Sequence, residues 1–142
     1  MGDTIKDIMR IECPATTAFD LMADARNELK WNSGVSQVDL ISGKPIGQGS
    51  RFRVTDKRGQ HEVEITAYQR PENLSFSLKD KSMDVDIDFT LSQEGSFTVM
   101  TGRFNATGKG FMRFLLPILV PFIRRDIAKE HQKFIALCQA SP

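Results

Sequence analysis

Residues 83–91 read MDVDIDFTL, and this stretch decides the fold class. Apolar side chains occupy every second position, with aspartate or threonine between them. A period of two is typical of a β-strand that has one buried and one solvated face. We therefore predict an antiparallel strand whose inner face carries Met83, Val85, Ile87, Phe89 and Leu91.

Alternating segments of the same kind fill residues 35–107 and are separated by clusters of turn-forming residues. This pattern is typical of an antiparallel meander. Residues 4–12 predict one further strand, in which Asp7 alone breaks the apolar alternation. Farther on, Phe97 and Met100 fall on opposite parities, so we expect a β-bulge between them.

Helical spacing appears first between these two strand regions. After Pro14, apolar residues recur every three or four positions, which predicts a short helix. Asp24 can cap a second short helix that ends near Trp31. The chain is therefore expected to be an α+β protein with two short helices after its first strand.

Residues 110–139 predict one long C-terminal helix of about 45 Å, at roughly 1.5 Å per residue. Pro117 and Pro121 predict a bend, because each proline removes a backbone donor. The apolar run at residues 111–123 is shorter than the ~20 residues that span a bilayer. We expect this part of the helix to be buried on most sides.

Composition and charge limit the possible binding partners and the cellular location. The chain has 142 residues, so we expect a single domain, 1–142. It has 19 Lys and Arg against 18 Asp and Glu, so we expect no net electrostatic attraction to nucleic acid. Residues 1–10 lack the apolar run of a secretory signal, which favours the cytoplasm. No spacing of Cys, His or carboxylates indicates a metal site, and no motif indicates a cofactor.

The polar candidates are few. His61 and His131 are far apart in sequence and are expected at the surface. Asp84, Asp86 and Asp88 belong to the solvated face of their strand, which argues against a cation site. No catalytic residue is predicted.

Two glutamates on one predicted strand leave an alternative open. Glu62 and Glu64 alternate with Val63 and Ile65, which favours an outward orientation. If Glu64 points inward instead, it becomes a polar contact of an internal cavity and its pKa rises unless a cation pairs with it.

Four short motifs carry a resemblance to a known family. They are IECP at residues 11–14, Asp24 followed by Trp31, GQGSRF at 47–52 and GKG at 108–110. In this order the chain resembles the START-like (SRPBCC) superfamily of polyketide cyclase/dehydrase and lipid transport proteins. The resemblance implies the helix-grip fold, in which a curved sheet of about seven antiparallel strands wraps around the C-terminal helix and leaves a cavity between them.

The resemblance turns the aromatic and methionine residues into candidate ligand contacts, because without it they would simply fill a core. The predicted lining is Trp31, Phe52, Phe76, Met83, Val85, Ile87, Phe89, Phe104, Met112, Leu115, Leu116 and Leu119. Methionine and phenylalanine supply soft or flat surfaces that suit an apolar molecule.

Three functions are compatible with this reading. The first is a non-catalytic carrier or sensor of a small hydrophobic molecule such as a lipid, isoprenoid, quinone or aromatic polyketide. The second is a cyclase/dehydrase-type enzyme that uses the same cavity, and the third is an interaction module whose pocket has collapsed. The basic last helix adds an expected transient contact with a membrane, and the chain is expected to be a monomer or a homodimer.

Overall fold

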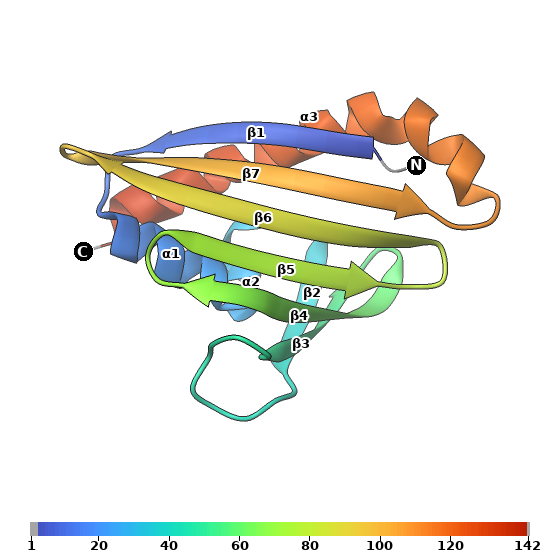
Figure 1. Ribbon diagram of the computed structural model, residues 1–142, viewed down its shortest axis with the longest axis horizontal. Coiled ribbons are helices and arrows are strands. Elements are labelled where there is room, and N and C mark those ends of the chain that lie inside the picture. Colours follow the sequence, from blue (N-terminus) through green and yellow to red (C-terminus); the bar gives the residue numbers. More distant parts are fainter. Residues whose placement is uncertain (1–2, 142) are drawn as a thin grey trace.

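Seven antiparallel strands form one sheet in the order β1-β7-β6-β5-β4-β3-β2 in the computed structural model, which describes residues 3–141 (Figure 1). The strands are β1 (Asp3–Ile11), β2 (Val35–Leu40), β3 (Arg51–Asp56), β4 (Gly59–Gln69), β5 (Asn73–Lys79), β6 (Met83–Glu94) and β7 (Phe97–Gly108). Neighbours in sequence are neighbours in the sheet, except that β1 pairs with the last strand. Residues 1, 2 and 142 of the predicted domain lie outside the described part of the chain.

The short helices follow β1 as expected. They are α1 (Ala15–Ala23), the 3₁₀ turn η1 (Ala25–Asn27) and α2 (Glu28–Trp31). Pro14 occupies the N-cap of α1, and the Asp24 carboxylate accepts a hydrogen bond from the Arg26 backbone N–H at 3.1 Å. A side-chain acceptor at this point satisfies one of the free N–H groups that begin a helix. Asp24 thus acts as a cap, as predicted, but of the 3₁₀ turn η1, whereas the N-cap of α2 is Asn27.

Alternation along β6 is also confirmed. Met83, Phe89 and Leu91 are buried, and Val85 and Ile87 are half-buried on the same inner face. On the outer face, the Asp88 carboxylate accepts hydrogen bonds from the side chains of Asn73 and Ser75.

The predicted bulge in β7 is wrong. The pairing of β6 with β7 runs without a register shift from Met83 to Glu94, and Thr98 and Met100 share the buried face. Thr98 belongs inside because its hydroxyl donates to the Cys13 carbonyl at 2.8 Å. Phe97 instead lies on the outer face, with the Arg10 guanidinium 3.5 Å from its ring centroid.

Helix α3 (Met112–Ala140) confirms the predicted C-terminal helix and contains both prolines. It packs against β1, β7 and α2, and in Figure 1 its first turns run in a different direction from the rest. Within residues 3–141, no helix is both long and apolar enough to cross a bilayer. The architecture is the helix-grip fold.

The expected burial of the first half of α3 is wrong. Its last turns are buried at Phe134 and Cys138, but large apolar side chains nearer its start are exposed. Their exposed fractions are 77% for Phe111, 67% for Phe114, 66% for Ile118 and 58% for Phe122. Leu116, by contrast, is 2% exposed, so the first half of α3 buries one side and leaves its other apolar side in solvent.

A glycine on β7 makes room for the aromatic cluster on the inner face. Gly102 lies opposite Phe89 in the sheet, and the Phe89 and Phe104 rings meet edge to face at 5.9 Å. A Cβ at Gly102 would lie 2.8 Å from one atom of the Phe89 ring and 3.1 Å from one of the Phe104 ring.

Gly102→Ala is therefore expected to lower the free energy of unfolding by about 1–3 kcal/mol, because the rings must shift. Urea denaturation measures the change. Gly43→Ala is the matched control, since a Cβ there meets nothing within 4 Å, and its effect should stay below about 1 kcal/mol. Equal effects at the two glycines would contradict the proposed crowding.

Candidate functional site

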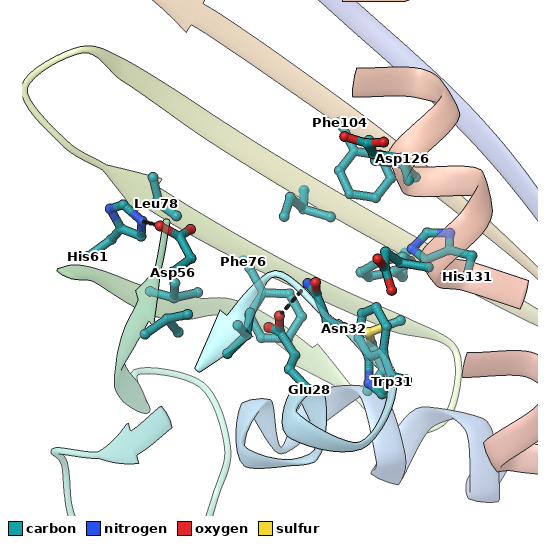
Figure 2. Close-up of a pocket in the computed structure, with 18 residues that line it drawn as sticks. Glu28, Trp31, Asn32, Asp56, His61, Phe76, Leu78, Phe104, Asp126 and His131 are labelled. Atoms are coloured by element: carbon teal, nitrogen blue, oxygen red, sulfur yellow. Dashed lines mark hydrogen bonds and ion pairs between the residues drawn. The ribbon is translucent and has the colours of Figure 1, made fainter. Parts of the chain in front are cut away.

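A cavity of about 290 Å³ lies between the inner face of the sheet and helices α2 and α3 (Figure 2). Its apolar lining is Met22, Trp31, Val35, Val54, Val63, Phe76, Leu78, Ile87, Phe89, Phe104 and Ile127. Typical ligand pockets occupy about 300–1,000 Å³, so this cavity is sized for one small molecule.

The structure brings together five of the twelve apolar residues that the sequence suggested. These five line the cavity: Trp31, Phe76, Ile87, Phe89 and Phe104. The others lie elsewhere in the core or on α3 and do not border it: Phe52, Met83, Val85, Met112, Leu115, Leu116 and Leu119. A ligand contact by any of the twelve stays a prediction.

Glu64 does not point into the cavity. It is exposed on the outer face of β4, beside Glu62, whose carboxylate lies 3.2 Å from the Arg51 guanidinium. The buried neighbours on this strand are His61 and Ile65. Plain alternation thus decides the orientation, and Glu64 is no polar contact of this cavity.

The histidines, expected at the surface, are both buried, and this expectation is wrong. His131 is 4% exposed and borders the cavity from α3, and its Nδ1 lies 2.5 Å from Oδ2 of Asp7 on β1. The missed signal is periodic, since His131 falls on the helical face of Ile127 and Phe134. Asp7, the break in the β1 alternation, is its partner.

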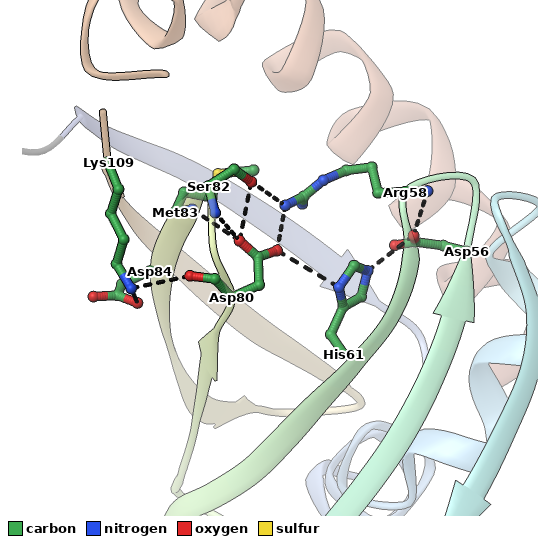
Figure 3. A network of polar contacts seen from close by, with 8 residues as sticks. All are labelled: Asp56, Arg58, His61, Asp80, Ser82, Met83, Asp84 and Lys109. Carbon is green, nitrogen blue, oxygen red and sulfur yellow. Dashed lines mark hydrogen bonds and ion pairs between the residues drawn. The ribbon is translucent and has the colours of Figure 1, made fainter. Parts of the chain in front are cut away.

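His61 belongs to a polar network at the other end of the cavity (Figures 2 and 3). Its Nε2 lies 2.9 Å from Oδ1 of Asp56, and its Nδ1 lies 3.5 Å from Oδ2 of Asp80. Arg58 also pairs with Asp80, and Lys109 joins Asp84 at 3.0 Å. This network ties the β3–β4 and β5–β6 turns together, so a structural role accounts for it.

Glu28 is the cavity group whose protonation is most strongly shifted. Burial is the largest effect and, with the nearby charge of Asp56, raises its pKa to about 7, while a hydrogen bond from Asn32 Nδ2 at 3.1 Å opposes the rise. A carboxyl with this pKa is partly protonated near neutral pH, so it can either donate or accept a hydrogen bond.

Glu130 shows the opposite outcome on the α3 side of the cavity. Burial raises its pKa, but hydrogen bonds from the Ser33 hydroxyl at 2.6 Å and backbone N–H at 3.2 Å, with Lys133 at 3.2 Å, outweigh burial and lower the pKa overall. The carboxylate therefore stays charged and fastens the loop after α2 to α3.

The arrangement suits binding more readily than metal chemistry. Four carboxylates border the apolar space, from Glu28, Asp56, Asp126 and Glu130. Among the described residues, no three His, Cys, Asp or Glu side chains are grouped so that they could hold a metal ion.

Trp31 is 7% exposed, and its indole N–H has no partner within residues 3–141.

Comparison with known proteins adds a family and two structural neighbours. The family model described as "Polyketide cyclase / dehydrase and lipid transport" matches residues 4–139. The crystal structure of Ara h 8.0201 superposes with a TM-score of 0.77 at 11% identity, covering 99% of this chain and 100% of that one. The di-domain ARO/CYC BexL, from the BE-7585A biosynthetic pathway, gives 0.74 at 16% identity.

The second comparison covers 99% of this chain and 51% of BexL, so the chain spans about half of that protein. No curated protein matches the chain in sequence. Identities this low establish the shared fold alone.

The pKa of Glu28 makes stability depend on pH. Because its folded-state pKa, about 7, lies above the ordinary value of 4.5, folding favours the protonated form. The stabilisation is complete below pH 4.5 and is lost as the pH rises through 7. Glu28→Gln should therefore stabilise the protein at pH 8 by up to roughly 3 kcal/mol and change little at pH 4.5.

Denaturant unfolding of both proteins at the two pH values tests this difference. Gln keeps an oxygen that can accept from Asn32, so the local hydrogen bond survives the substitution. An equal stability difference at both pH values would show that ionisation of Glu28 does not destabilise the folded protein.

Proposed function

The chain belongs to the polyketide cyclase / dehydrase and lipid transport family, and from that premise we propose that it is a carrier or sensor that binds one small hydrophobic molecule in its cavity. The observation that carries the proposal is the partly open cavity of about 290 Å³ with a largely apolar wall. Well-packed interiors hold few voids larger than a water molecule, so an unfilled space of this size supports binding.

The cavity wall narrows the class of ligand. Phe76 and Phe89 meet edge to face at 6.4 Å, and Phe89 meets Phe104 in the same way at 5.9 Å. These rings offer flat surfaces to a ring system or a short isoprenoid. The volume favours a quinone, an aromatic polyketide or a short isoprenoid over a two-chain lipid.

Cyclase/dehydrase-type catalysis in the same cavity is the alternative function. His131 and Glu28 border the space and are groups that can move protons. We place the carrier first because two of the cavity carboxylates are already engaged, Asp56 by His61 and Glu130 by Ser33. Substrate turnover that disappears when one cavity polar group is changed would favour the enzyme.

Ile87→Phe tests the cavity, because Ile87 borders it from β6 and a larger side chain there enters ligand space. The variant should change the free energy of unfolding by less than about 1 kcal/mol. It should weaken binding of the uncharged probe N-phenyl-1-naphthylamine by about tenfold, since a ring takes up much of a pocket this small. Titration followed by the fluorescence of Trp31, the only tryptophan, measures the affinity.

Leu91→Phe is the matched control, because Leu91 is buried on the same strand but does not border the cavity. It should overpack the core by about 1–3 kcal/mol and leave probe affinity unchanged. A large loss of stability for Ile87→Phe with unchanged probe binding would contradict the cavity. Native mass spectrometry of the freshly purified protein then identifies any retained ligand.

A transient contact with an anionic membrane is the second part of the proposal. Phe114, Ile118 and Phe122 follow helical spacing and form one exposed apolar stripe on α3, which Phe111 extends. We call these four residues the aromatic stripe. An amphipathic helix with cations beside its apolar face is suited to lie in a bilayer interface.

Cations flank the aromatic stripe along its length. The Arg113 guanidinium lies 5.4 Å from the Phe114 ring, and that of Arg125 lies 5.9 Å from the Phe122 ring. Neither arginine forms an ion pair with another described residue, so both charges remain available to lipid phosphates. This charge favours an anionic bilayer over a second copy of the chain as the partner of the stripe.

Phe114→Ser with Phe122→Ser should abolish flotation with vesicles of phosphatidylcholine and phosphatidylserine. Ile8→Ser is the control, because Ile8 is 59% exposed on β1, outside the stripe, and should leave flotation unchanged. Pure phosphatidylcholine vesicles should bind the wild type more weakly. Absence of wild-type binding, or a concentration-dependent dimer that the double variant abolishes, would overturn the membrane contact.

The cytoplasmic location and the choice between monomer and homodimer stay predictions.

A further inference from the structure

A carboxylate–imidazole pair, half-buried at Asp7 and buried at His131, joins the first strand to the last helix. Asp7 occupies an inward position of β1 between Ile5 and Met9, which are 4% and 2% exposed. Its Oδ2 lies 2.5 Å from Nδ1 of His131, which α3 places at the cavity wall. The two residues are 124 positions apart, and the fold alone brings them together.

Asp7 determines which nitrogen of His131 carries the proton. An ionised carboxylate only accepts hydrogen bonds, so Nδ1 of His131 is the N–H donor in this contact. In the neutral ring, Nε2 then keeps its lone pair. Burial is the largest effect on His131 and lowers its pKa, with Asp7 opposing the change, so the neutral ring dominates at pH 7.

The His131 ring lies within an aromatic collar on the cavity wall. The centroids of Trp31, Phe89 and Phe104 lie 6.0, 6.2 and 5.8 Å from its own. No described side chain donates a hydrogen bond to Nε2. Nε2 is not among the fully buried polar atoms that lack a partner, so it remains accessible from the cavity, where a donor on a bound molecule can replace solvent as its partner.

The charges around the cavity limit what that molecule can be. Glu28, Asp126 and Glu130 border the cavity together with His131, and Asp7 lies behind the ring. Among the described residues, no Lys or Arg lines the space. A carboxylate or phosphate would therefore meet like charges and no cation, whereas a neutral hydroxyl or N–H would not.

We propose that His131 is the specificity-determining hydrogen-bond acceptor of the cavity, positioned by Asp7, and that it selects a neutral, flat apolar molecule carrying a hydroxyl or N–H donor. This inference rests on the proposed function, namely that the cavity takes one small hydrophobic molecule. It adds the polar group by which such a molecule is recognised.

Matched probes test the inference at pH 7. 2-Naphthol carries the donor, 2-methoxynaphthalene has the same ring system without it, and 2-naphthoate replaces it with an anion. Wild-type protein should bind 2-naphthol about three- to tenfold more tightly than 2-methoxynaphthalene, the range of one net hydrogen bond, and should bind 2-naphthoate most weakly. Equilibrium dialysis measures all three affinities.

His131→Phe should remove the preference for 2-naphthol while keeping an aromatic ring in the collar. Asp7→Asn should reduce the preference, because an amide can donate to Nδ1 and leave Nε2 as the N–H. In wild-type protein, the ¹⁵N resonance of His131 Nε2 should shift on adding 2-naphthol and not on adding 2-methoxynaphthalene. This third measurement does not depend on the folding of either variant.

The outcomes separate the two proposals. If no probe binds the wild type, the small-molecule cavity itself fails. If 2-naphthol and 2-methoxynaphthalene bind equally, or if His131→Phe keeps the preference, the cavity stands and the role of His131 is overturned. If Asp7→Asn keeps the full preference, the positioning role of Asp7 is overturned.

Discussion

The burial of the last turns of α3 against the inner face of the sheet is the constraint on which the cavity depends. Phe134 and Cys138 have no exposed surface, and the Phe134 ring lies 5.3 Å from that of Trp31. The Gln139 side chain accepts a hydrogen bond from the Glu12 backbone N–H at 3.0 Å, which holds the helix end beside the end of β1. With this end sealed, the unfilled space lies beside the preceding turns, where Ile127 and His131 border it.

Because only its last turns are anchored in this way, the two ends of α3 have different surroundings. Toward its end, apolar side chains are covered by the sheet and α2, whereas Phe114 and Phe122 near its start face outward. Exposed aromatic side chains in a row are costly in water unless another surface covers them. The cavity and the aromatic stripe thus belong to one helix.

Most carboxylates around the cavity have a hydrogen-bond or ion-pair partner within the protein. Asp56 is engaged by His61, and Glu130 by Ser33, so both have structural roles, and the lowered pKa of Glu130 keeps that carboxylate ionised. Glu28 and His131 differ, because burial raises the pKa of Glu28 and lowers that of His131, and both shifts favour the neutral side chain. Neutral groups that can still form hydrogen bonds are what an apolar cavity needs to recognise a ligand without the cost of a buried charge.

The sequence by itself determined the strands, the short helices and the long helix. The apolar residues of each segment recur with the period of a strand or of a helix, and this local pattern does not depend on distant contacts. It placed Phe89 and Ile87 on the inner face, and the family resemblance carried by four short motifs implied the helix-grip fold. It failed at Thr98 and His131, since a polar residue can be buried when a distant partner satisfies it, as Cys13 and Asp7 do here. Which polar groups share the cavity was decided only by the tertiary structure, because pairing β1 with β7 and laying α3 beside them is what brings Asp7 to His131.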